Sequence, residues 1–262
     1  MGTFNYSTDE YISSRSADKL QFDVNKIKLG NLPGLFERIQ HEGGYFKKWS
    51  AMWAAGPTDA EEGMTEEEPE AVLENIKVKG ITVNTVCLHV GAGTFLPVKS
   101  SRVAEHTMHR EPFVVTLAFL KGLLERTGKV VAVGTTSVRT LESLYYAGVA
   151  CIETGQPSDV DQWAPYSRDY EYTTDESIRA LISYMESNGL NEIQLGTRII
   201  IVPGFRFRVV DVLVTNFHQP KSTLLLLISA FVGGDWKAIY DYALANDFRF
   251  LSYGDSSVLF RV

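Results

Sequence analysis

The stretch from Val210 to Phe231, VDVLVTNFHQPKSTLLLLISAF, constrains the fold of this chain more than any other segment. It opens with a run of apolar, mostly β-branched residues, which is typical of a strand buried on both faces. The run ends in polar residues around His218, and Pro220 blocks any continuation of the strand's hydrogen-bond ladder. Ser222 is placed to cap the apolar helix that follows. Open α/β sheets bind ligands where a strand ends and a helix begins, so we expect functional residues here.

Apolar runs and helical patterns alternate from Ile81 onward. Strands are expected at 81–90, 129–134, 197–204, 206–217 and 248–254. Helices are expected at 117–128, 177–189, 222–233 and 236–247, and a loop followed by a helix at 135–148. Thr173 and Glu176 form a capping-box pattern ahead of the third helix, and 149–172 is expected to be a loop. This alternation predicts an α/β fold with a mainly parallel sheet covered by helices, in three α/β/α layers.

The first 80 residues differ from the remainder in their pattern. They show no sustained hydrophobic period, and Asp59 to Glu74 carries eight acidic residues and no basic one. Such a charge run is typical of a solvated loop, here 59–74, and a short helix closed by Gly80 is expected after it. We therefore predict an N-terminal segment at 1–80 and an α/β domain at 81–262.

Composition narrows the class of protein. The formal net charge of -7 argues against a surface coated for nucleic acid, although local basic patches remain available. Two cysteines give neither a disulfide framework nor a zinc-binding spacing, which favours a reducing compartment. The residues from Met1 to Asp23 show no signal-peptide pattern, and the longest apolar run is shorter than the ~20 residues of a membrane span. We expect a cytoplasmic protein that does not associate with membranes.

A first group of polar residues follows the strand expected at 81–90. The glycines of His89-Val-Gly-Ala-Gly-Thr94 let backbone N–H groups approach a ligand closely. His106 and His109, three residues apart, stand near Glu111 and can form a proton-transfer set. The same spacing suits a metal, but neither a cysteine nor a third histidine is nearby, and we expect no metal. The alternative is a glycine turn with surface histidines.

A second group lies in the loop, and at the start of the helix, expected within 135–148. Hydroxyl and N–H groups at a helix N-terminus bind anions or ribose hydroxyls, and the residues available for this are Thr135, Thr136, Ser137 and Arg139. The alternative is ordinary capping by Thr136 or Ser137. The stretch lacks the Gly-Lys-Ser/Thr ending of a nucleoside triphosphate loop.

The third group belongs to the opening stretch and includes Asn216, His218, Ser222 and Thr223. Between a buried strand and a capped helix, His218 is expected to be well placed and to titrate near neutral pH, as acid–base work requires. Asp255, near the C-terminus, is expected to bring a carboxylate to the same edge of the sheet.

Long motifs from all three groups resemble one family, the S-adenosylmethionine:tRNA ribosyltransferase-isomerases of queuosine biosynthesis. The motifs are HVGAGTFLPV, EHTMHREPF, VAVGTTSVRTLES, VPGFRFRVVDVLVTNFHQPKSTLLLLISAFVG and FRFLSYGDSSVL, which lie in the family's order between Ile81 and Leu259. Family members carry a β-barrel domain ahead of the α/β part. The 80 residues before Ile81 leave little room for one, so we expect a reduced or missing barrel. Of the family's PTAGLHF motif, only Pro57-Thr58 is kept.

The resemblance implies a reaction. The family transfers the ribosyl part of S-adenosylmethionine to 7-aminomethyl-7-deazaguanine in tRNA and isomerises it, which gives epoxyqueuosine and releases methionine and adenine. S-adenosylmethionine is then a substrate, and no cofactor is implied. The alternative is a non-catalytic relative that binds a nucleoside or tRNA.

The reaction implies roles that the sequence leaves open. A base must remove a proton beside the sulfonium, and Glu111, His109 or His218 is available. Leaving adenine needs a proton donor, for which His89 or His218 is available. The remaining candidates are expected to bind substrate: Gly91, Gly93, Thr94, Thr135, Thr136, Ser137, Arg139, Asn216, Ser222, Thr223 and Asp255. Docking of tRNA is expected to rely on local cations such as Arg206, Arg208 and Lys221.

Overall fold

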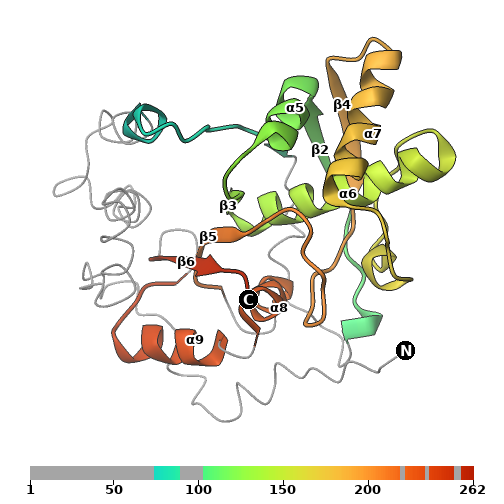
Figure 1. Ribbon diagram of the computed structural model, residues 1–262. Coiled ribbons are helices and arrows are strands. Elements are labelled where there is room, and N and C mark those ends of the chain that lie inside the picture. Colours follow the sequence, from blue (N-terminus) through green and yellow to red (C-terminus); the bar gives the residue numbers. More distant parts are fainter. Residues whose placement is uncertain (1–73, 89–102, 219–221, 234–235, 251–254) are drawn as a thin grey trace.

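The computed structural model describes residues 74–88, 103–218, 222–233, 236–250 and 255–262 (Figure 1). Within them the strands form two three-stranded sheets. The first has the order β1-β2-β4 and contains β1 (Cys87–Leu88), β2 (Glu111–Thr116) and β4 (Glu192–Thr197). The second has the order β3-β5-β6 and contains β3 (Val131–Val133), β5 (Val212–Asn216) and β6 (Ser256–Phe260). The protein is thus a mixed α/β structure with small sheets.

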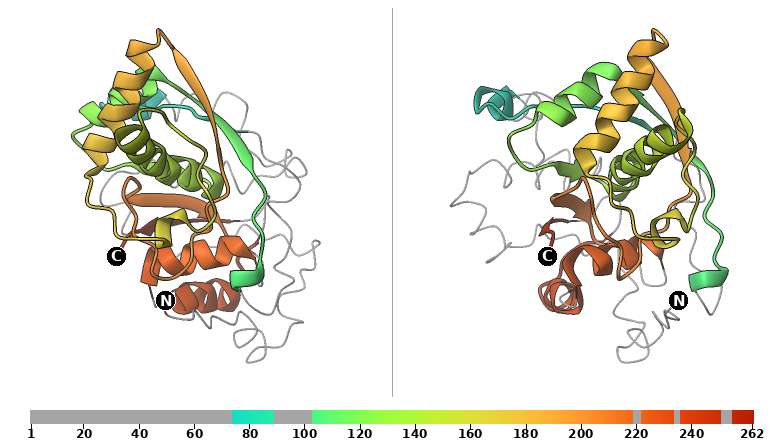
Figure 2. Two further views of the ribbon diagram at one scale, coloured as in Figure 1. Left: turned by 90° about the vertical axis from the view of Figure 1, so that its right-hand side faces the viewer. Right: turned by 45° about the vertical axis from the view of Figure 1, so that its right-hand side comes forward.

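Five α-helices have their bounds within the described residues. They are α5 (Leu117–Glu125), α6 (Thr135–Thr154), α7 (Thr174–Ser187), α8 (Thr223–Val232) and α9 (Trp236–Ala245), with 3-10 turns η3 (Val103–Glu105) and η4 (Ala164–Tyr166). The views in Figures 1 and 2 place α6 above β5, and α8 and α9 below it. Helices α5 and α7 lie beside β2 and β4 at the opposite end of the molecule from α9.

The expected parallel sheet is wrong for the described strands. Only β3 and β5 pair in parallel, whereas β1–β2, β2–β4 and β5–β6 are antiparallel. One cause is β2, which was not anticipated. Its side chains alternate between buried and half-buried positions, as in a strand with one covered face. The other is the C-terminal strand β6 (Ser256–Phe260), which pairs antiparallel with β5. Of the strand expected at 248–254, residues 248–250 are not in a strand, and 251–254 lie outside the described residues.

Several expected element bounds also change. Residues 81–86 form no strand and are mostly exposed. Residues 198–202 are mostly buried but also form no strand, since the strand in this region is β4, which ends at Thr197. Helix α6 runs on to Thr154, so the loop expected at 149–172 begins only at Gly155, which ends the helix with a left-handed φ of 82°. The capping box of α7 and the closing role of Gly80 (φ 76°) are confirmed. Most of the predicted segment 1–80, including almost all of the acidic loop, lies outside the described residues, and the domain boundary stays a prediction.

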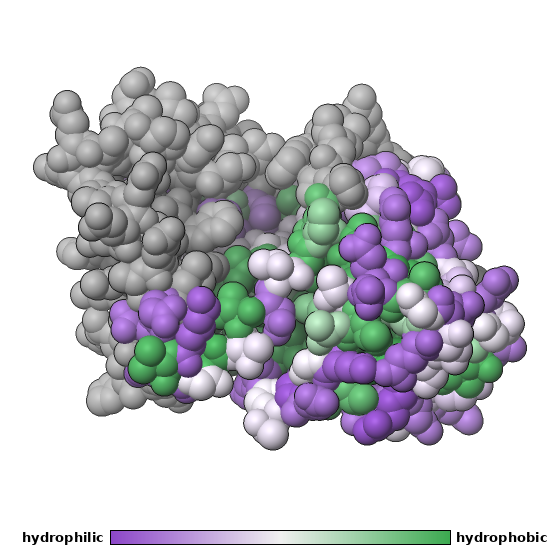
Figure 3. Space-filling model, turned by 90° about the horizontal axis from the view of Figure 1, so that it is seen from above, coloured by the Kyte–Doolittle hydropathy of each residue, from purple (hydrophilic) through white to green (hydrophobic). Residues whose placement is uncertain are grey.

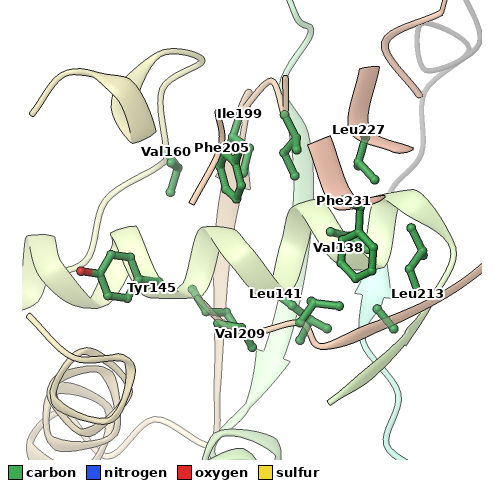
Figure 4. Close-up of a cluster of buried hydrophobic side chains, with 14 of the residues drawn as sticks. Val138, Leu141, Tyr145, Val160, Ile199, Phe205, Val209, Leu213, Leu227 and Phe231 are labelled. Carbon is green, nitrogen blue, oxygen red and sulfur yellow. The ribbon is translucent and has the colours of Figure 1, made fainter. Parts of the chain in front are cut away.

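Helix α6 joins the two sheets through one hydrophobic core. The core cluster contains Phe113 of β2 as well as Leu213 of β5. Around the first half of α6, Val138 lies near Phe231 of α8, while Tyr145 lies further along the helix towards Val160 (Figure 4). Because the middle of this helix is covered on most sides, several of its polar side chains are buried, among them Arg139, Glu142 and Ser143, and each of these needs a partner inside the protein.

The surface has no uniform character on the face seen in Figure 3. Hydrophilic residues cover much of its described part, and hydrophobic residues are exposed among them. Val131 and Val133 of β3 are among the exposed large hydrophobic residues of the protein. Within the described residues no single helix is long and apolar enough to cross a membrane, and α8 and α9 meet that test only together, as a pair bent by 114°.

Candidate functional site

The ends of β3 and β5 form the first part of the candidate site. The strands are parallel, with Val133 opposite Val214, and Gly134 donates its N–H to the carbonyl of Val214 at 2.8 Å. Thr135 therefore begins α6 next to Thr215, at the edge where both strands finish. Two of the three predicted groups meet here, the 135–139 stretch and the stretch that follows Val214.

The start of α6 is not capped by a side chain. Its N-cap is Gly134, with a φ of 88° and no side-chain hydrogen bond to the first turn. Thr136 and Ser137 lie inside the first turn, so the capping role considered for them is wrong. Thr135 is buried, whereas Thr136 and Ser137 are half-buried. A helix of twenty residues that begins without a side-chain cap directs the N–H groups of its first turn to an approaching ligand.

His218 follows β5 at the same edge. Its Nε2 lies 3.0 Å from Oγ1 of Thr215, and its backbone N–H donates to the hydroxyl of Tyr240 in α9 at 3.0 Å. Burial lowers the pKa of His218 to about 4. The expectation of a titration near neutral pH is therefore wrong, because the fold shields this half-buried ring from part of its contact with water.

The helix after His218 starts as predicted. Ser222 caps α8, with its Oγ accepting from the N–H of Leu225 at 3.2 Å, and Thr223 is the first helical residue. Both are half-buried. A capping role accounts for Ser222 at this position, and its role in substrate binding stays a prediction.

Asp255 reaches this edge but faces inward. Asn216 pairs with Ser256, which places Asp255 just beyond the end of β5. Its carboxylate accepts from the backbone N–H of Arg249 at 2.7 Å and lies 3.8 Å from the Arg249 guanidinium. Burial raises the pKa of Asp255. The carboxylate thus ties residues 249 and 255 together, and only 5% of the residue is exposed.

A second cluster consists of His109, Glu111 and Arg139. Nη1 of Arg139 lies 2.5 Å from Oε2 of Glu111, and Nε2 of His109 lies 3.0 Å from Oε1 of the same carboxylate. Arg139 also donates through Nε to the carbonyl of Ile199 at 3.0 Å. Among the described residues Nη2 of Arg139 is buried without a hydrogen-bond partner. Burial lowers the pKa of Arg139, against the charge of Glu111, which raises it.

The two parts of the candidate site share helix α6. Arg139 is four residues after Thr135, so both side chains lie on one face of the helix, one turn apart. The fold therefore links the helix start at the β3–β5 edge to the His109 cluster at the start of β2. His89, Gly91, Gly93, Thr94 and Lys221 lie outside the described residues.

Glu142, which the sequence interpretation left out of the site, is the most buried acid of α6. Its carboxylate accepts from the backbone N–H groups of Arg208, Val209 and Val210 at 2.8, 3.0 and 2.9 Å. Burial raises its pKa to about 7, although these three donors lower it. An acidic residue in the middle of an apolar helix face was the signal for this role. In the described part of the chain, no three His, Cys, Asp or Glu residues gather as metal ligands.

Most of the chain is similar in sequence to known proteins of one family. Residues 67–259 match the family model described as "Queuosine biosynthesis protein". The chain is 43% identical over 194 residues to the S-adenosylmethionine:tRNA ribosyltransferase-isomerase of Caulobacter vibrioides, an alignment covering 72% of this chain and 42% of that protein. It is 41% identical over 195 residues to the protein of that name from Brucella ovis, covering 73% and 43%.

A solved structure is also similar to this chain. The S-adenosylmethionine tRNA ribosyltransferase of Thermotoga maritima is 30% identical, with a TM-score of 0.46, and the match covers 74% of this chain and 49% of that one. The chain spans about two-fifths of the length of the curated relatives that it matches.

Proposed function

Because this chain belongs to the queuosine biosynthesis protein family, we propose that it acts in the transfer and isomerisation of the ribosyl part of S-adenosylmethionine. The acceptor is 7-aminomethyl-7-deazaguanine in tRNA, and the product is epoxyqueuosine. The observation that carries the proposal is the match of residues 67–259 to the family, together with the names of the relatives at 41–43% identity. S-adenosylmethionine is a substrate here, and the proposal needs no cofactor. Both proposed substrates favour a cytoplasmic place of action.

The β3–β5 edge is the proposed place for the sugar of S-adenosylmethionine. Hydroxyl groups at the start of α6, on Thr136 and Ser137, are half-buried, and the N–H groups of that turn point along the helix axis. Asn216 ends β5 next to them. Ribose hydroxyls both donate and accept, so hydroxyl, amide and backbone N–H groups suit them.

His218 has a different role in this proposal from the one expected for it. With a pKa near 4 its ring is neutral at physiological pH. A neutral imidazole is a hydrogen-bond partner and not a store of positive charge. We assign it to orient Thr215 and the substrate at the end of β5, rather than to protonate leaving adenine as an imidazolium.

Adenine release tests the proposed function. The parent chain is mixed with S-adenosylmethionine and tRNA that carries the aminomethyl base, and adenine, methionine and modified tRNA are measured. We expect all three products, with none of them when either substrate is omitted. Heat of binding for S-adenosylmethionine without product would indicate a non-catalytic nucleoside-binding relative. A folded chain that gives neither heat at millimolar ligand nor product would overturn the proposal.

A matched pair of variants tests the placement of the sugar. The double variant Thr136→Ala/Ser137→Ala removes two hydroxyls at the start of α6, and each is expected to contribute about 0.5–1.5 kcal/mol. Affinity for S-adenosylmethionine should fall roughly tenfold or more. The control is Thr154→Ala at the far end of the same helix, where the hydroxyl bonds to the carbonyl of Ala150. Equal affinities in all three proteins would refute the placement.

A further inference from the structure

The segment that carries His106 and His109 is held by a side chain that the sequence interpretation left out of the site. We propose that Gln162 is a positioning residue for the reaction, which clamps the backbone of residues 106–108 and so fixes where both histidines stand towards the substrate. The inference rests on the proposed function for its substrate, and on the contacts of Gln162 for the clamp.

Residues 106–110 lie outside helices and strands. They connect the turn η3, which ends at Glu105, to strand β2, which begins at Glu111. The backbone N–H of His106 still bonds to the turn, at 3.1 Å from the carbonyl of Val103. Peptide groups that are neither in a helix nor in a sheet need other partners where they are shielded from water. For this segment a side chain from a distant part of the chain provides them.

Gln162 offers both a donor and an acceptor to this backbone. Its Oε1 accepts from the N–H of Met108 at 2.9 Å, and its Nε2 donates to the carbonyl of His106 at 2.6 Å. A backbone N–H only donates and a backbone carbonyl only accepts, so one orientation of the amide satisfies both. The side chain thus bonds to two peptide groups of the segment, as a neighbouring strand would.

The segment that carries Gln162 is itself fixed to the protein. The backbone of Val160 bonds to Gly196 and to Arg198, in both cases at 2.9 Å, and the carbonyl of Gln162 accepts from the N–H of Ile200 at 3.3 Å. These contacts run along the end of β4 and beyond it. The amide therefore projects from a backbone that is already tied down.

The clamp holds the chain between the two histidines. Met108 is 5% exposed and belongs to a core cluster with Ile200 and Leu226. With its side chain in the core and its N–H on Gln162, Met108 gives the backbone little freedom to turn. His106 is half-buried, and the side chain of His109 is 32% exposed. Two partly exposed histidines thus flank a residue that is fixed.

The two histidines also lie within electrostatic reach of each other. Burial lowers the pKa of His106, and the charge of His109 lowers it further. Their relative placement depends on the backbone between them, which is the part that Gln162 holds. A displacement of about 1 Å in a group that faces a reacting atom can cost roughly 100-fold in rate. Gln162 can therefore affect the reaction strongly through the backbone alone.

Two variants of Gln162 break the clamp in different ways. Gln162→Met keeps the length of the side chain and removes both hydrogen bonds. Gln162→Glu keeps an acceptor for the N–H of Met108 but sets a carboxylate oxygen against the carbonyl of His106, where two acceptors repel each other. The second variant therefore loses only the donor, and it keeps the size and polarity of the side chain.

Tyr166→Phe is the matched control. The hydroxyl of Tyr166 donates to the carbonyl of Ile200 and accepts from the N–H of Val202, both at 3.0 Å. Its removal costs two hydrogen bonds to backbone from a side chain only four residues after Gln162. These bonds hold residues 200–202 and not residues 106–108. The control thus reports what a loss of stability in this part of the fold does by itself.

NMR signals of the histidine rings report on the clamp without any need for turnover. The chain has five histidines, and the variants His106→Gln and His109→Gln identify the signals of these two. Both ring signals should move in Gln162→Met and keep their positions in Tyr166→Phe. Signals that stay unchanged in Gln162→Met, or that move equally in the control, would overturn the inference whether or not the parent is active.

Kinetics separate this inference from the proposed function. If the parent is active, both Gln162 variants should lower kcat roughly 10- to 100-fold with KM within a few-fold. Tyr166→Phe should stay within a few-fold of the parent. A kcat of Gln162→Met close to that of the parent, or an equal loss in the control, would overturn the positioning role. If the parent releases no adenine, the proposed function fails, and the ring signals decide whether Gln162 fixes the segment.

Discussion

Individual buried carboxylates of this protein have different tasks. Glu111 pairs with an arginine and a histidine, whereas Glu142 holds three consecutive backbone N–H groups of the segment that leads into β5. Asp255 holds the backbone N–H of Arg249. In each case burial would be costly without a partner. The partners of Glu142 and the arginine partner of Glu111 come from distant parts of the chain, whereas that of Asp255 is six residues away.

Replacing Glu142 should destabilise the protein more than replacing a charged surface residue of the same helix. Glu142→Ala leaves three backbone N–H groups without an acceptor, two of them buried and one half-buried, and we expect a loss of about 3 kcal/mol in the free energy of unfolding. The control is Glu153→Ala, which breaks the exposed ion pair with Arg168 and should cost less than about 1 kcal/mol. Urea melts of both variants measure the difference. Losses of similar size would contradict the anchoring role.

The pKa of His218 predicts a loss of stability in acid. Its folded pKa, about 4, lies below the ordinary value of 6.5, so the unfolded state binds more protons between these pH values. The contribution is complete above pH 6.5 and is lost as the pH falls towards 4. Between pH 7 and pH 5 this amounts to at most about 2 kcal/mol, and less because the ring is half-buried.

The His218→Gln variant separates the effect of His218 on acid stability from the effects of other titrating groups. Glu142, whose pKa is raised to about 7, acts in the opposite direction, since it favours the folded state as the pH falls from 7 towards 4.5. That effect is present in both the parent and His218→Gln. Thermal melts at pH 7 and pH 5 should therefore show a smaller acid-induced loss in His218→Gln than in the parent. The same loss in both proteins would rule out a buried neutral His218.

At the scale of elements, the contact between α6 and α7 depends on one glycine. Gly148 lies in α6, and a β-carbon there would collide with the carbonyl oxygen and the hydroxyl of Ser177 in α7. Ser177 also donates its hydroxyl proton to the carbonyl of Tyr145. Gly148 thus permits a close approach of two helices, and it does not end the helix as the sequence interpretation assumed.

Two glycine-to-alanine changes should have opposite signs. Gly148→Ala forces α6 and α7 apart and should cost about 2 kcal/mol or more. Gly122→Ala in α5 places its methyl group where no atom lies within 4 Å, and it should stabilise the protein by about 0.5–1 kcal/mol through helix propensity. Thermal melts give both signs. A neutral Gly148→Ala would mean that the two helices have room to separate.

At the scale of the whole molecule, the charge distribution bears on binding of tRNA. The net charge is -7. Of the cations expected to contact phosphates, Arg208 already has partners within the protein. It stacks on Tyr145, 4.7 Å from the ring centre, and donates to the carbonyl of Tyr170. Arg206 is exposed in the segment that leads into β5 and remains a candidate for a phosphate contact.

Affinity for tRNA should therefore fall steeply with salt and depend on Arg206. Arg206→Gln should weaken binding and reduce the slope of log affinity against log salt by roughly 0.7–0.9, the effect of one lost phosphate contact. Arg179→Gln, an equal charge change at an exposed position of α7, serves as the control. Binding measured at several salt concentrations gives the slopes. A parent affinity that does not change with salt would exclude phosphate-driven docking.

Local interactions are what the sequence by itself determined. Three helix ends were predicted correctly: the capping box of α7, the Ser222 cap of α8 and the left-handed Gly80. Each depends on atoms within about four residues of one another. The family was identified for a similar reason, since its motifs are continuous stretches. The buried apolar run that ends in β5 was also recognised from its composition.

Only the tertiary structure decided the pairing of strands and the state of the polar groups. Strand direction depends on which segments meet, and the alternating pattern of β2 was visible but its antiparallel partners were not. Glu111 and Arg139 are 28 residues apart, and Glu142 and Val210 are 68 apart. The pKa of His218 follows from its burial by the folded chain. Desolvation and long-range contacts depend on the whole fold, so no local pattern encodes them.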